Sequence, residues 1–270
     1  MSSKGTGLDT GILRRSAGRS GRLLLGVVGF VVVVAFWYAI HLLGIFREGL
    51  LPTPVEVFSA LVDSFSNGSI LFDIAISIQR VFIGVIVGLT AAIPVGFVLG
   101  WYRPMRLMFD PLVNFFRALP PIALVPLVIV YFGIGELART SVLIYAAFFA
   151  AVIVIYEGII SIEGIYVRAA QTLGASEWEI FSKIVLPLSV PSILVALRVA
   201  LGVSWATLVA AELIAAQRGL GAVIQEAGNF FQIPDVYGGI ILIGLAALVM
   251  DRLVRTATAR LVGWQERVAR

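Results

Sequence analysis

Long apolar runs alternate with short polar segments along the 270 residues of the chain. Several runs reach or exceed the roughly 18 to 20 residues that a helix needs to cross a bilayer core of about 30 Å. The pattern therefore predicts an all-α polytopic membrane protein with six transmembrane helices. The expected spans cover about 23–46, 73–99, 107–132, 140–160, 191–216 and 237–254.

Smaller features refine this pattern. Residues 55–65 carry apolar side chains on one helical face and predict a short amphipathic helix, and a second short helix is expected near 223–230. The Gly-xxx-Gly spacings at 84–88 and 96–100 let helix backbones approach closely, so the second span is expected inside the bundle. The third span contains Pro120, Pro121 and Pro126 and therefore cannot be a straight helix. Its bend either only serves the packing of the helices or shapes a helix that lines a pathway.

The positions of the basic residues predict which segments face the cytoplasm. Most arginines lie on segments that alternate spans would place in the cytoplasm, whereas Arg47, Arg139 and Arg218 fall on outer segments. Both termini are therefore expected in the cytoplasm. Residues 1–22 are predicted to be a disordered basic tail, 23–260 a single transmembrane domain and 261–270 a second cytoplasmic tail.

Composition excludes several classes of protein. The chain is 60% hydrophobic and 13% charged, with a mean hydropathy of +1.01, which no soluble globular domain of this length shows. It has no cysteine and one histidine, His41, so neither a metal site nor a cysteine or histidine-dependent enzyme is expected. The net charge of +4 comes from arginines beside spans, not from a basic face for nucleic acid. The only lysines, Lys4 and Lys183, lie outside any Gly-rich phosphate loop, so the chain binds no ATP itself.

The longest polar segment is 168–187. Ser176 and Glu179 form a capping-box pattern, so a helix is expected to begin after a bend at Gly174. From the physics alone, this segment is either an ordinary loop or a surface offered to a partner.

A resemblance favours the second interpretation. The segment resembles the "EAA" loop of ABC-importer permeases, the cytoplasmic element that docks into a groove on the ATPase subunit, although Arg168 replaces the acidic residue that names the motif. The resemblance implies that this segment binds the ATPase. The residues that it assigns to docking are Ala169, Ala170, Gly174, Ala175, Ser176, Glu177, Glu179, Leu186 and Pro187.

The resemblance extends along the chain after residue 50. Segments such as 117–123, 132–136, 173–176 and 208–216 are similar to the permeases for nitrate, sulfonates and taurine, most of all to the taurine branch. It implies a type I ABC-importer permease fold in a bacterial inner membrane. It further implies a homodimer of permeases, a separate ATPase dimer holding ATP and Mg, and a periplasmic or lipid-anchored binding protein. The implied cargo is a small organic anion, taurine or a related sulfonate, with nitrate, bicarbonate or an aromatic or pyrimidine solute as alternatives.

Four charged residues fall inside the predicted spans, and each is expected to face the bundle interior. Arg80 and Glu212 are expected near the outer side, either as a buried ion pair or, for Arg80, as a group that draws an anion inward. Arg117 and Arg198 lie deeper and are candidates for the pathway of an anion. A secondary transporter, the remaining alternative, would need coupling carboxylates at mid-membrane, for which only Glu212 is evident.

Overall fold

The computed structural model of the chain describes residues 19–47, 49–215 and 217–261. They form two compact units, one up to Phe58 and the other from Ser59 onward. The expected tails at 1–22 and 261–270 lie largely outside the described residues. Arg19 to Arg22, assigned to the first tail, form the first turn of a helix that continues into the apolar run.

The first unit consists of α1 (Arg19–Leu42) and the beginning of α2 (Pro54–Ser66). The Trp37 indole donates a hydrogen bond to the Pro52 carbonyl (3.0 Å), and His41 Nδ1 lies 2.8 Å from the Leu51 carbonyl oxygen. The only histidine therefore holds the connection between the two helices. Thr53 and Glu56 form a capping box at the start of α2, with hydrogen bonds of 2.7 and 3.2 Å, which explains why the amphipathic helix begins there.

Three long helices form the core of the second unit: α3 (Ser69–Trp101), α6 (Glu136–Ile160) and α9 (Leu186–Ala215). The glycines of α3 lie against α6. A Cβ built on Gly84 would be 2.6 Å from the Leu143 Cβ, and one on Gly88 would be 2.8 Å from the Ile144 carbonyl oxygen. These helices approach so closely because the glycines have no side chain, as the Gly-xxx-Gly spacing predicts.

The expected third span is two helices. α4 (Arg103–Ala118) and α5 (Pro121–Phe132) meet at an angle of 91°, and Leu119 and Pro120 between them are extended. Proline has no N–H and disfavours helix at the preceding residue, so consecutive prolines end α4 here. The described residues contain five helices long and apolar enough to cross a membrane, or six if the bent pair counts as one span.

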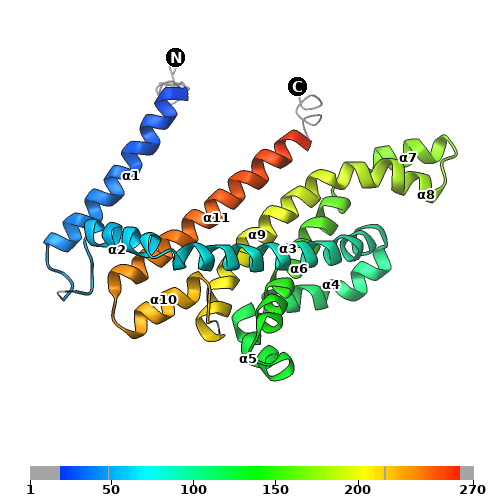
Figure 1. The fold of residues 1–270 in the computed structure, drawn as a ribbon. Coiled ribbons are helices and arrows are strands. Elements are labelled where there is room, and N and C mark those ends of the chain that lie inside the picture. The colour runs from blue at the N-terminus through cyan, green and yellow to red at the C-terminus, as the bar shows by residue number, and fades with distance from the viewer. Residues whose placement is uncertain (1–18, 48, 216, 262–270) are drawn as a thin grey trace, which may run out of the picture. The chain divides into compact units, whose positions relative to one another are not determined.

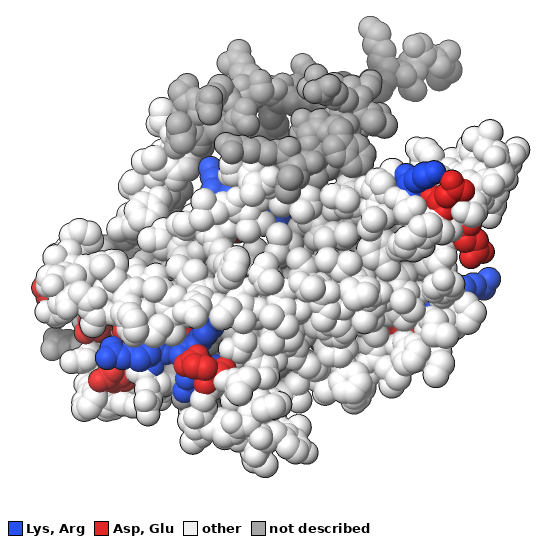
Figure 2. Space-filling model, turned by 45° about the vertical axis from the view of Figure 1, so that its right-hand side comes forward, with Lys and Arg blue, Asp and Glu red and all other residues white. Residues whose placement is uncertain are grey.

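The remaining elements lie toward the ends of the second unit. α7 (Gly164–Thr172), α8 (Glu177–Ile180) and the π-helical turn η2 (Phe181–Val185) lead into α9, while α10 (Leu220–Asn229) precedes α11 (Ile233–Leu261). Figure 1 shows α7 and α8 at one end of this unit and α10 near the opposite end. Between them, the face in Figure 2 has a broad surface that is almost free of charged side chains.

The helix that contains the fifth span begins before the expected start of the span. A start near Pro191 was expected, but the helical path is continuous from Glu177 to Leu213, which is 37 residues. Proline inside a helix removes one hydrogen bond and bends it without necessarily ending it. At 1.5 Å per residue the path measures about 55 Å, so roughly half of it extends beyond a bilayer core of about 30 Å. Glu177, Glu179 and Lys183 lie in its first turns, which favours this end as the part outside the core.

Candidate docking and transport sites

The predicted docking segment is a bent helical pair. α7 ends at Thr172, and Gly174 has φ +80°, a left-handed conformation that favours glycine. The Ala175 N–H donates to the Ala170 carbonyl (3.0 Å) and the Gly174 N–H to the Gln171 carbonyl (3.0 Å). These hydrogen bonds satisfy carbonyls at the end of α7 and fix the turn.

The second helix of the segment begins with the predicted capping box. Glu179 N–H donates to Ser176 Oγ (3.3 Å), Ser176 N–H donates to Glu179 Oε2 (3.1 Å), and Lys183 Nζ donates to Glu179 Oε1 (2.9 Å). The hydrogen bonds from Lys183 and then from Ser176 lower the pKa of the Glu179 carboxyl to about 2. The carboxylate is therefore ionised at neutral pH and holds the beginning of the helix.

The docking residues divide into anchored and exposed groups. Ala170, Ile180 and Val185 are buried, and Phe181 packs edge-on against Phe97 of α3 with ring centres 5.4 Å apart. Ala170 thus packs within the protein, and Ala175 and Glu179 are half-buried. The residues that face outward are Ala169, Gly174, Ser176, Glu177, Leu186 and Pro187.

Two large apolar side chains that the motif did not single out are exposed on the same segment. Leu173 is 88% and Trp178 73% exposed, although both are hydrophobic and lie beside polar neighbours. The outer side of the bent pair therefore carries apolar side chains beside charged ones.

A second site is a buried polar cluster centred on Arg80. Its Nη1 lies 2.6 Å from Glu212 Oε1, the ion pair that the sequence suggested. Arg80 also binds Glu136 through two parallel hydrogen bonds of 2.6 and 2.8 Å and donates to the Arg218 carbonyl (2.7 Å). The Arg80 and Glu212 side chains are 4% and 0% exposed, so the pair is fully enclosed by protein.

The same cluster holds the beginning of α10. Asp73 Oδ1 accepts a hydrogen bond from Gly219 N–H (2.8 Å), Ser77 Oγ from Leu220 N–H (2.9 Å) and Glu212 Oε2 from Gly221 N–H (2.8 Å). The first N–H groups of a helix have no partner within it and favour negative charge nearby. The cluster thereby connects α3, α9 and α10.

Sequence reasoning missed several members of this cluster. Arg139 was interpreted as an outer topology signal, but it is 8% exposed and binds Glu136 (2.7 Å) at the start of α6. Asp73, Ser77 and Arg80 are spaced i, i+4 and i+7, which places them on one face of α3. This row of polar residues on an otherwise apolar helix is the sequence feature that could have predicted the cluster.

Another carboxylate that sequence reasoning missed lies in α4. Tyr156 of α6 donates a hydrogen bond to Asp110 Oδ1 (2.6 Å), and Asn114 Nδ2 donates to the Asp110 carbonyl (2.9 Å). Asp110 is thus already bonded within the protein. It ties α4 to α6.

The remaining two intramembrane arginines are separate from the Arg80 cluster. Arg117, in the last turn of α4, makes no hydrogen bond or ion pair to any described residue and lines a cavity of about 210 Å³. Arg198 of α9 is half-buried, and its Nε has no partner within the described part of the chain. The structure therefore does not pair either arginine with a carboxylate.

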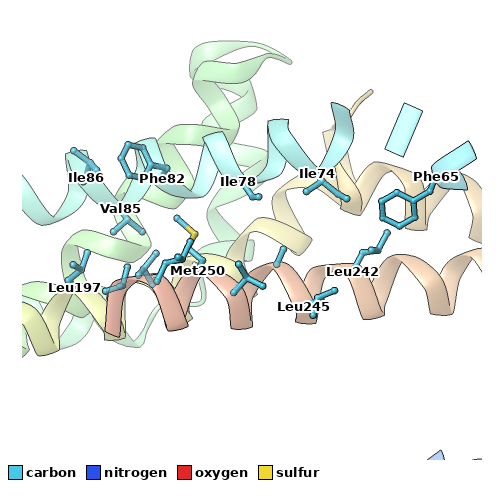
Figure 3. A pocket seen from close by; sticks show the side chains of 15 residues that line it. Phe65, Ile74, Ile78, Phe82, Val85, Ile86, Leu197, Leu242, Leu245 and Met250 are labelled. Atoms are coloured by element: carbon cyan, nitrogen blue, oxygen red, sulfur yellow. The ribbon is translucent and has the colours of Figure 1, made fainter. Parts of the chain in front are cut away.

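A larger groove, of about 570 Å³, lies between α3, α9 and α11. Figure 3 shows Ile78 and Phe82 of α3 facing Met250 of α11 across it. All of its lining side chains are apolar, so it offers nothing to bind an anion. Its chemistry matches that of lipid chains or an apolar helix.

Comparisons with known proteins agree with this geometry. Residues 84–263 match the family model described as the binding-protein-dependent transport system inner membrane component. A probable ABC transporter permease protein of Brucella abortus (strain 2308) is 43% identical over 243 residues, covering 90% of this chain and 96% of the relative. The taurine transport system permease protein TauC of Escherichia coli (strain K12) is 35% identical over 255 residues, covering 92% of each.

Solved structures share the fold. An inward-facing structure of the MetNI methionine ABC transporter aligns with a TM-score of 0.58 at 21% identity, covering 71% of this chain and 97% of that one. The all-helical architecture is thus that of ABC-importer permeases, multi-pass membrane proteins that are transport subunits. The chain belongs to the family of binding-protein-dependent transport system inner membrane components.

Proposed function

We propose that this chain is the permease of an ATP-driven importer that moves taurine or a related small sulfonate across a bacterial inner membrane. The observation that carries the ATP-driven part is the docking segment, a capped and bent helical pair with exposed Leu173 and Trp178. The similarity to the taurine relative along 92% of both chains supports the choice of solute. Nitrate, bicarbonate and aromatic or pyrimidine solutes are the alternatives within the same class of importer.

In this proposal the docking segment lies in the cytoplasm, where an ATPase dimer binds it. The end of the second unit that carries α10 then faces outward, toward a binding protein that delivers the solute. Two copies of the permease enclose the pathway, since one chain supplies only half of a two-fold assembly. ATP-driven closure of the ATPase dimer would move the docking segments and shift the permease between outward- and inward-facing states.

The test uses the reconstituted complex of permease, ATPase and binding protein. The binding protein is first titrated with taurine, alkanesulfonates, nitrate and bicarbonate, and ATPase activity is then measured with each loaded form. Taurine or a sulfonate should bind selectively and stimulate hydrolysis. Stimulation by nitrate or bicarbonate alone would refute the sulfonate assignment, and no stimulation by any loaded form would refute the importer itself.

A matched pair of variants tests the docking role. Leu173→Ser removes an exposed apolar side chain and should reduce retention of the ATPase on the permease. Leu107→Ser changes a leucine that is 68% exposed but lies in α4, outside the docking segment, and should leave retention unchanged. Equal retention by the two variants would contradict the assignment of the docking surface.

A further inference from the structure

The cavity beside Arg117 is built from three parts of the second unit. Arg117, Leu119 and Pro121 come from the bend between α4 and α5, Tyr145 and Phe149 from α6, and Val199 and Val203 from α9. Its volume is about 210 Å³, which leaves room for a small solute.

Arg117 is the only charged residue that lines this cavity. The Tyr145 hydroxyl is already used, because it donates a hydrogen bond to the Phe116 carbonyl. The rest of the lining is aromatic or aliphatic. The cavity thus combines one guanidinium group, which has five N–H donors, with apolar walls. This combination suits a ligand that has an anionic group on a short carbon chain.

The charge of Arg117 needs an explanation. Arginine in a membrane span is costly unless it pairs with a carboxylate or faces water. Arg80 and Arg139 pair with Glu136 and Glu212, whereas Arg117 is exposed and has no hydrogen-bonding or ionic partner among the described residues. A guanidinium in a cavity without a counter-ion is therefore available to an anion that enters it.

The depth of the cavity decides between two sources of anion. Its α6 lining runs from Tyr145 to Val154, the middle turns of a helix that spans Glu136–Ile160. Phospholipid head groups lie at the membrane surfaces, about 15 Å from the middle of the core. This position along α6 favours a soluble anion over a lipid head group.

We propose that the cavity at the α4–α5 bend is an intramembrane binding site for the transported anion, with Arg117 holding its sulfonate or carboxylate group. This inference rests on the proposed import of a small organic anion and adds the place where the anion is held. The forked donors of Arg117 match two oxygens of the anionic head. Phe149 and the valines of α9 contact the short carbon chain.

The test exploits the absence of cysteine from the natural chain. Val203→Cys places a single thiol in the cavity of the permease–ATPase complex. Its reaction rate is measured with two methanethiosulfonate reagents of similar size, one carrying an ethylsulfonate and the other a trimethylammonium group. A nearby uncompensated cation should favour the anionic reagent by about tenfold or more.

Two comparisons isolate Arg117. In the Val203→Cys background, Arg117→Gln should abolish the preference for the anionic reagent, whereas Arg117→Lys should retain it. The control Arg106→Gln removes a charge from the other end of α4 and should leave the preference unchanged. A thiol at Val130, which is 79% exposed on α5 and outside the cavity, should show no such preference.

The outcomes distinguish this inference from the proposed function. The cavity site alone would be overturned if the natural complex imports a sulfonate but Val203→Cys reacts equally with both reagents. The same holds if Val203→Cys reacts with neither reagent in the nucleotide-free and ATP-bound states. Import that survives Arg117→Gln with unchanged KM would do the same. A natural complex that imports no anion would refute the proposed function.

Discussion

The Arg80 cluster yields the most quantitative prediction, for the variant Glu212→Ala. The side chain of Glu212 is fully buried and accepts hydrogen bonds from Ser77, Arg80 and the N–H of Gly221. Arg80 keeps its two hydrogen bonds to Glu136 in this variant, so its charge is not left without a partner. The variant loses the hydrogen bond from Arg80 to Glu212 and leaves the Gly221 N–H without an acceptor, and each of these losses costs about 1–3 kcal/mol. We therefore expect Glu212→Ala to destabilise the permease by about 2–6 kcal/mol.

The prediction is checked by thermal unfolding of the purified permease, with Asp251→Asn as the control. Asp251 also pairs with an arginine, Arg255, but the two side chains are 44% and 62% exposed. Such surface pairs contribute about 0–1 kcal/mol, so this variant should melt close to the natural protein. Adding Arg80→Met to Glu212→Ala should cost less than the sum of the single changes, because each single change already removes the interaction between Arg80 and Glu212. Equal melting of Glu212→Ala and Asp251→Asn would refute the reasoning.

Three further predictions concern packing, capping and a hydrogen bond. Gly88→Ala should destabilise by about 1–3 kcal/mol because its methyl group would meet the α6 backbone, whereas Gly244→Ala, with nothing within 4 Å, should stabilise by about 0.5–1 kcal/mol; equal melting temperatures would contradict the packing of α3 on α6. Ser176→Ala should cost the docking helix about 0.5–2 kcal/mol, seen as faster amide hydrogen exchange confined to α8, and unchanged exchange would argue against the capping box. Tyr156→Phe should destabilise by about 1.5–3 kcal/mol through loss of a hydrogen bond to a carboxylate, and a melting temperature equal to that of the natural protein would exclude that bond.

Local patterns in the sequence predicted local structure well. The capping box at Ser176, the bend at Gly174 and the close approach through Gly84 and Gly88 depend on residues a few positions apart, and the structure contains each of them. The prolines near Pro120 predicted that the third span is not straight. They did not give the angle between the two helices, which is 91°.

Contacts between distant residues were only partly predictable. The Arg80–Glu212 pair followed from charge and expected depth, but the role of Ser77 did not, because it caps a helix that begins more than a hundred positions later. The burial of Arg139 was not predicted, because a charge near the end of a span looks the same in sequence whether it is paired or facing water. The structure pairs it with Glu136, one turn earlier on the same helix.

The central claim is that this chain couples ATP hydrolysis on a separate subunit to the entry of a small sulfonate. The most direct test is uptake of radiolabelled taurine into proteoliposomes that contain the permease and its ATPase, with loaded binding protein outside and ATP inside. We expect uptake that requires both hydrolysable ATP and the binding protein. An ATPase variant that cannot hydrolyse ATP should abolish this uptake. Uptake driven by a proton or sodium gradient without ATP would contradict it.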